Sequence, residues 1–308
     1  MINLVSSRYR MLTIAACVGM LLVLLAGALV TNTDSGRGCG DDWPLCHGKF
    51  IPAYTLESML EYSHRAVSAI VGFLVLALFI VTMMYHRKSK EAVIYTSSAL
   101  FFTVLQALLG AAAVKWPQSP PVMALHFGFS LLALASTMLI VMWAYRNKKA
   151  KSDQVRISVP RSVYRWSWII FVYTYVVVYI GAFIRHTDAA GGCVGWPLCN
   201  GQVIPEMSGA TGIVFVHRVA ALILALAVIG LAVHIHKVSG HDGLKLTSKW
   251  TVGLVVFQIF SGALLTMTVT NDNVFIFTGL LHNLIVSAYF GIIADLCIRS
   301  WKYREGRI

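Results

Sequence analysis

The chain has 308 residues, of which 57% are hydrophobic and 12% charged, and its mean hydropathy is +0.72. A soluble domain carries about 25% charged residues, so this composition effectively excludes a soluble enzyme, a disordered protein and a disulfide-rich secreted module. It predicts an integral membrane protein. The formal net charge of +12 alone would suit a nucleic-acid binder, but the positions of the basic residues along the chain argue against that function.

Eight stretches are long and apolar enough to cross a bilayer, which takes roughly 20 residues at about 1.5 Å each. They cover residues 11–31, 66–85, 92–114, 121–145, 166–185, 211–236, 250–270 and 274–298. The first stretch does not resemble a removed signal peptide, because polar residues rather than a small-residue cleavage site follow it. We therefore predict an all-α membrane protein with eight transmembrane helices.

Lysine and arginine gather in alternate connecting segments. With the N-terminus inside, 19 of the 25 basic residues lie on the inner side and 6 on the outer side. The positive-inside rule then predicts that both termini are cytoplasmic. The basic patches are topology signals, so we expect a multi-pass protein of the cell membrane with lipid around it and no nucleic-acid partner.

The sequence contains an internal repeat. Residues 27–52 read GALVTNTDSGRGCGDDWPLCHGKFIP and residues 181–205 read GAFIRHTDAAGGCVGWPLCNGQVIP. Further pairs follow in the same order at offsets of 152 to 156, among them Gln106 with Gln258 and Gly110 with Gly262. A match of this length predicts a duplicated structural unit.

Each copy contains four spans, so both copies start and end inside and are parallel repeats. Short connections favour antiparallel neighbours. We predict two pseudo-symmetric four-helix bundles, residues 1–150 and 151–308, and interpret the basic stretch from Arg146 to Arg165 as the linker.

Four of the ten histidines occupy matched places in the two copies. They are His64, His126, His217 and His282, each in or just before the outer half of an even-numbered span. Ionisable side chains inside a bilayer are costly and indicate function. The second and fourth helices of a four-helix ring are diagonal, so their imidazoles suit the two axial positions of one haem iron per copy. The alternatives are weaker: a hydrogen bond between helices does not explain the duplication, and zinc requires about four ligands.

The copies differ beside the first histidine. Glu61 precedes His64 by three residues and lies on the same helix face, whereas the second copy has Val214 at that position. A carboxylate near a buried haem could relay protons or stabilise positive charge on a substrate, although it could also pair with Arg65. Glu57, one turn earlier, is a weaker candidate. This asymmetry predicts a reacting haem in the first bundle and an electron-transferring or structural haem in the second.

Two further pairs of residues recur in the outer segments. Arg65 and Arg218 follow the histidines and could pair with haem propionates or extend to the membrane interface. The cysteine pairs Cys39 with Cys46 and Cys193 with Cys199 both end in WPLC, and the oxidising outer face predicts a disulfide in each loop. A dithiol that exchanges electrons with the haem is the alternative.

Together, these segments resemble one family closely, haem A synthase of the Gram-positive bacterial type. The resemblance spans essentially the whole chain, through GALVTNTDSGRGCG, WPLCHG, EYSHR, QALLGA, ALHFG, the second WPLC and FVHR. It implies oxidation of a ring methyl group of haem O to a formyl group, which gives haem A for terminal oxidases.

By this resemblance, His64 and His126 correspond to the catalytic site in the first bundle and Glu61 to its essential glutamate. The corresponding ligands of a haem b cofactor in the second bundle are His217 and His282, and both cysteine pairs correspond to disulfides of the outer loops. Haem O synthase is the expected protein partner, because haem O is poorly soluble, and the electron acceptor is unidentified. A b-type electron carrier and a haem transporter or chaperone are the rival functions.

Overall fold

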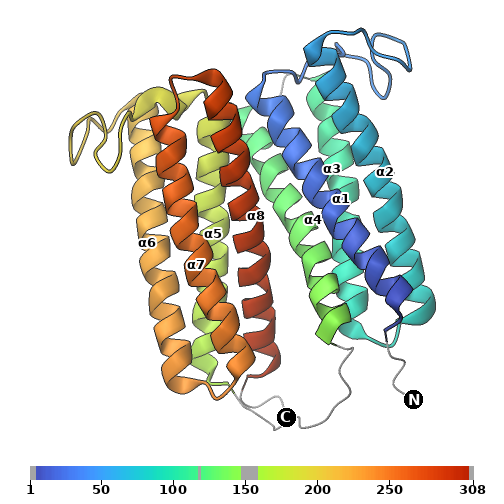
Figure 1. Ribbon diagram of the computed structural model, residues 1–308, viewed down its shortest axis with the longest axis vertical. Coiled ribbons are helices and arrows are strands. Elements are labelled where there is room, and N and C mark those ends of the chain that lie inside the picture. Colours follow the sequence, from blue (N-terminus) through green and yellow to red (C-terminus); the bar gives the residue numbers. More distant parts are fainter. Residues whose placement is uncertain (1–4, 117–118, 147–158, 305–308) are drawn as a thin grey trace. The chain divides into compact units, whose positions relative to one another are not determined.

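A computed structural model describes residues 5–116, 119–146 and 159–304. This part of the chain folds into eight long helices and one short 3-10 helix (Figure 1): α1 Ser7–Asn32, α2 Leu56–Tyr85, α3 Lys90–Lys115, α4 Pro120–Arg146, α5 Arg161–His186, η1 Ala189–Gly192, α6 Gly209–Val238, α7 Asp242–Met267 and α8 Asp272–Lys302. All eight α-helices are long and apolar enough to cross a membrane. The predicted all-α, eight-span fold class is confirmed.

Side-chain caps begin several of these helices. The hydroxyl oxygens of Ser6, Thr55 and Ser89 accept hydrogen bonds from backbone N–H groups in the first turns of α1, α2 and α3, and Asn271 does the same for α8. Such caps satisfy N–H groups that have no partner inside the helix. The caps therefore define the first residue of these helices, which the pattern of apolar residues alone does not define.

All eight helices begin earlier than hydropathy predicts, and two of them by eight residues or more. The α2 helix starts ten residues before the predicted span at 66, and α7 starts eight residues before the predicted span at 250. Their first turns, LESMLEYSHR and DGLKLTSK, are rich in polar residues and therefore lower the hydropathy of any window that contains them. His64 is consequently inside α2 rather than at its edge.

The chain divides into two compact units, Met1–Ser152 and Asp153–Ile308. In the first unit α1 packs on α2 and α4, and α3 packs on the same two helices. In the second unit α5 packs on α6 and α8, and α7 packs on these two. Each unit is therefore a ring of four helices in which the histidine-bearing helices, α2 with α4 and α6 with α8, are diagonal.

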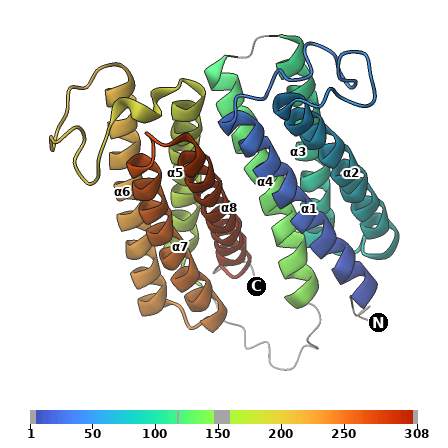
Figure 2. The same ribbon diagram turned by 45° about the horizontal axis from the view of Figure 1, so that its top comes forward.

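The loops that contain the two cysteine pairs, between α1 and α2 and between α5 and α6, share their backbone conformation; we call them the disulfide loops. Asp34 and Asp188 are both left-handed at φ 51°, and His47 and Asn200 are left-handed at φ 50° and 53°. The peptide bonds before Pro44 and Pro197 are both cis. The sequence repeat is thus also a repeat of loop structure, and Figure 2 shows the loop of residues 33–55 crossing the end of the first unit where α2 begins.

Large apolar side chains cover the outside of both units. Phe73, Phe101 and Phe277 are between 61% and 73% exposed, as expected of side chains that face lipid. The core of the second unit contains tightly packed residues such as Ile235, Tyr289 and Ile293. Residues 1–4, 147–158 and 305–308 lie outside the described residues, and with them most of the predicted linker and both chain ends.

Candidate functional site

The four matched histidines lie within the first eleven residues of α2, α4, α6 and α8. His64 and His217 are each the ninth residue of their helix, counted from Leu56 and Gly209. His126 is the seventh residue of α4 and His282 the eleventh residue of α8. At about 1.5 Å per residue these positions are roughly 9 to 15 Å along the helix axes. Each unit thus has two half-buried histidines at similar depth on diagonal helices.

In the first unit, Glu61 ties the disulfide loop to α2. The residue is 4% exposed. One carboxylate oxygen accepts a 2.8 Å hydrogen bond from the backbone N–H of Cys39, and the other accepts one from Arg65. Arg65 also donates to the carbonyl oxygens of Asp42 and Leu45, at 2.7 and 2.8 Å. The predicted alternative of a Glu61–Arg65 ion pair is what the structure contains.

The second unit has an apolar version of the same connection. Val214, the counterpart of Glu61, packs in a buried cluster with Cys193 and Cys199. Arg218 donates to the carbonyl oxygens of Cys193 and Leu198, at 2.7 and 3.2 Å. The arginine therefore anchors the outer loop in both units, and only the first unit adds a buried carboxylate.

Disulfides join Cys39 to Cys46 and Cys193 to Cys199, and all four residues are at most 1% exposed. Each bridge closes a loop next to the start of α2 or α6. Gly38 and Gly192 lie against the first-turn backbone of these helices, at Glu57 and Ala210, where a side chain would collide. Absence of a side chain at both glycines lets the loops approach the helices closely.

Ser261 and Gln258 bind the ring of His282, a contact that sequence reasoning missed. The Gln258 amide nitrogen, which can only donate, lies 2.8 Å from His282 Nε2, and Ser261 Oγ lies 2.8 Å from Nδ1. The ring proton is then on Nδ1, the tautomer that an iron ligand requires. Nε2 accepts the hydrogen bond from Gln258 in this structure, so iron at Nε2 would take the place of the Gln258 amide. Gln106, the counterpart of Gln258, instead donates to the backbone carbonyl of His126 at 2.7 Å.

The histidine environments fit a haem with two axial imidazoles. The buried Nδ1 atoms of His64 and His217 have no hydrogen-bond partner, which is unfavourable for an imidazole in an apolar bundle unless another bond of the ring compensates. Among the described residues no group of three or more metal-ligating side chains occurs, and a haem iron takes only two protein ligands.

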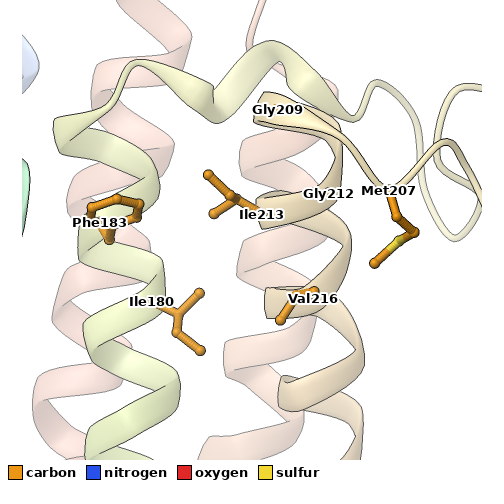
Figure 3. A pocket seen from close by; sticks show the side chains of 7 residues that line it. All are labelled: Ile180, Phe183, Met207, Gly209, Gly212, Ile213 and Val216. Carbon is orange, nitrogen blue, oxygen red and sulfur yellow. The ribbon is translucent and has the colours of Figure 1, made fainter.

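An apolar groove of about 490 Å³ opens between α5 and α6 of the second unit, close to the disulfide loop (Figure 3). Its walls include Ile180 and Val216, the immediate neighbours of Gly181 and His217 in the sequence. The groove is lined by Ile180, Phe183, Met207, Gly209, Gly212, Ile213 and Val216. The groove places hydrophobic surface rather than polar groups beside α6, the helix that carries His217.

Comparison with known proteins covers nearly the whole chain. A relative from Symbiobacterium thermophilum named "Heme A synthase" is 37% identical over 291 residues, which is 94% of each chain. Relatives with the same name are 39% identical in Halalkalibacterium halodurans, over 89% of this chain and 90% of theirs, and 38% identical in Bacillus licheniformis, over 96% of each. The sequence model of the COX15-CtaA family, described as "Cytochrome oxidase assembly protein", matches residues 10–59 and 53–293. The chain therefore belongs to the COX15-CtaA family.

Proposed function

We propose that this protein is a haem A synthase whose reaction takes place between His64 and His126 in the first unit. The reaction oxidises a ring methyl group of haem O to the formyl group of haem A. With water as the oxygen source, the balance is R–CH3 + H2O → R–CH2OH + 2 H⁺ + 2 e⁻, then R–CH2OH → R–CHO + 2 H⁺ + 2 e⁻. The membership of the family and the relatives named "Heme A synthase" support this activity.

The single observation that supports a reaction in the first unit is the asymmetry at one helix position. Glu61 is a buried carboxylate three residues before His64, whereas Val214 occupies its place before His217. A fixed negative charge stabilises positive charge that develops on a methyl carbon during its oxidation. Arg65 and the Cys39 N–H hold this carboxylate in place, so its position is organised before substrate binds.

The second unit is proposed to hold haem b through His217 and His282. When bound, this haem supplies one-electron transfer between the substrate and an external acceptor. Ser261 holds the His282 ring through Nδ1, and a hydrogen bond at that atom fixes the ring orientation and tautomer of a metal-bound histidine. Arg218 and Arg65 hold the outer loops over the two sites, and a propionate contact for either arginine remains a prediction.

The proposal includes an orientation and partners. The distribution of lysine and arginine supports cytoplasmic termini and disulfide loops on the outer face. Haem O reaches the first unit laterally from lipid, with its farnesyl tail in the membrane, and a haem O synthase hands it over. An electron acceptor of unidentified class completes the reaction.

The test uses a host that makes haem O and lacks its own haem A synthase. Haems extracted after expression of the full chain are separated by chromatography and identified by mass spectrometry. A new haem in which one methyl has become formyl supports the enzyme. Unchanged haem O, together with purified protein that carries haem b, would instead support a two-haem electron carrier.

A further inference from the structure

Each of the four matched histidines lies beside a glycine of the preceding helix. The pairs are Gly27 with His64, Gly110 with His126, Gly181 with His217, and Gly262 with His282. In every pair the imidazole atom nearest the glycine is Cε1. The same arrangement thus recurs at all four proposed iron ligands, on four different helix pairs.

The space left for a side chain differs among these four glycines. A Cβ atom added at Gly181 would lie 2.9 Å from Cε1 of the adjacent histidine, and the corresponding distance is 3.1 Å at Gly27, 3.2 Å at Gly262 and 4.0 Å at Gly110. Carbon atoms pack best at about 3.5–4.0 Å. A Cβ at Gly181 would therefore force His217 to shift, and a Cβ at Gly27 or Gly262 would press the adjacent imidazole by a few tenths of an ångström.

The contact also involves the nitrogen that would bind iron. At both Gly27 and Gly181 the added Cβ would lie 3.4 Å from Nε2 of the adjacent histidine. A methyl group at these places would push the ring sideways and redirect its Nε2. The Nδ1 atom of His64 makes no hydrogen bond that could hold its ring instead. The ring of His217 also has a hydrogen bond with the backbone of Val177, one turn before Gly181 on α5. Packing against glycine is thus a contact that orients both rings.

We propose that Gly27, Gly181 and Gly262 are positioning residues for the haem-ligating histidines. Each lets an imidazole pack closely against the backbone of the preceding helix, which restricts the direction of its Nε2. The ring of His282 is held in addition by hydrogen bonds with Ser261 and Gln258 of that helix. Gly110 contributes least, because its histidine is already at ordinary contact distance. The inference rests on the proposed function, since it assumes that these histidines ligate haem.

The first test is made in the second unit with purified full-length protein in detergent. Gly181→Ala and Gly262→Ala are compared with Gly253→Ala, which lies on α7 with Gly262 but has open space around it. The readouts are haem b per protein and the low-spin ferric signal in electron paramagnetic resonance. We expect Gly181→Ala to weaken haem b binding about tenfold or more, Gly262→Ala to weaken it less or to shift the signal, and Gly253→Ala to match the wild type.

The second test separates positioning from general packing in the first unit. Gly19 and Gly27 both lie on α1, but a Cβ at Gly19 would collide with Val71, at 2.8 Å, rather than with a histidine. Haem O binding is followed by absorbance, and haem b retained in the second unit reports that each variant is folded. We expect Gly27→Ala to reduce haem O binding, and Gly19→Ala and Gly110→Ala to retain it.

Two results would overturn the inference. One is wild-type haem b content and an unchanged resonance signal in Gly181→Ala. The other is equal loss of haem O from Gly19→Ala and Gly27→Ala, which would make the effect one of helix packing. A third result would overturn the proposed function itself: the wild-type protein shows no low-spin haem signal, or the signal persists in His217→Ala. The proposed ligands would then be wrong, and the inference would fall with them.

Discussion

At the scale of single residues, Glu61 is the strongest difference between the two units. Its carboxylate joins the loop at Cys39 to α2 and pairs with Arg65, so it has a structural contact as well as its proposed chemical role. The two roles respond differently to substitution. A glutamine preserves an acceptor for the Cys39 N–H but removes the negative charge.

We expect Glu61→Gln to lower conversion of haem O to haem A by about 100-fold, the size of effect seen when one preorganised electrostatic contact is lost. Haem b content of the second unit should stay at the wild-type level. The measurement is extraction and chromatography of haems from the complemented host. Glu57→Gln, on an exposed side chain of the same helix, is the control and should retain activity; full conversion by Glu61→Gln would exclude the proposed role.

Ser261 supports a second prediction at this scale. The hydrogen bond between its hydroxyl and His282 Nδ1 makes the imidazole a more basic ligand, which favours ferric over ferrous iron. Ser261→Ala should therefore raise the reduction potential of haem b and weaken its binding about tenfold. Redox titration of the purified protein measures the change.

The matched control is Ser287→Ala. Ser287 is equally buried in α8, but its hydroxyl donates to the carbonyl of Asn283 in the same helix. An equal change in both variants would show that the potential depends on general packing rather than on the Ser261 contact.

At the scale of elements, the disulfide loops depend on close backbone contact with the helices that carry the histidines. A Cβ at Gly192 would lie 2.5 Å from the carbonyl carbon of Ala210, in the first turn of α6. The loop above the second site therefore fits only with glycine at this position.

Gly192→Ala should destabilise the second unit by about 1–3 kcal/mol, the usual effect of overpacking. Thermal release of haem b, followed by absorbance, should then occur at lower temperature. Gly191→Ala changes the adjacent residue, where the structure leaves open space, and should behave as the wild type. A release temperature that is the same in both variants would contradict the proposed contact between loop and helix.

At the scale of the whole molecule, the proposed orientation places both disulfide loops on the outer face. Lys49, in the first of these loops, and Lys88, between α2 and α3, are both exposed and belong to opposite ends of α2. An impermeant maleimide should label Lys49→Cys in intact cells and Lys88→Cys only after permeabilisation. The reverse pattern would invert the topology, and unsubstituted protein reports background from Cys17 and Cys297.

Composition, hydropathy and the internal repeat were sufficient to predict eight spans and the matched histidines, and the resemblance of the sequence motifs indicated the family. These features depend on patterns within one stretch of chain, because a bilayer demands about 20 apolar residues wherever the chain crosses it. Boundaries failed at α2 and α7, where polar first turns are nevertheless helical. At α2 the Thr55 cap and the loop that contacts its first turns outweigh hydropathy.

Only the tertiary structure could show what surrounds the histidines. The sequence marked Gly110 and Gly262 as repeated positions, yet the glycine contacts with imidazoles join residues 16 to 37 positions apart on different helices. Likewise, Ser261 contacts His282 whereas the first copy has Leu109 at the equivalent place. The physical reason is that a side chain's neighbours across a helix interface depend on how the helices are rotated and how closely they pack. The residue pattern within one helix does not encode either of these.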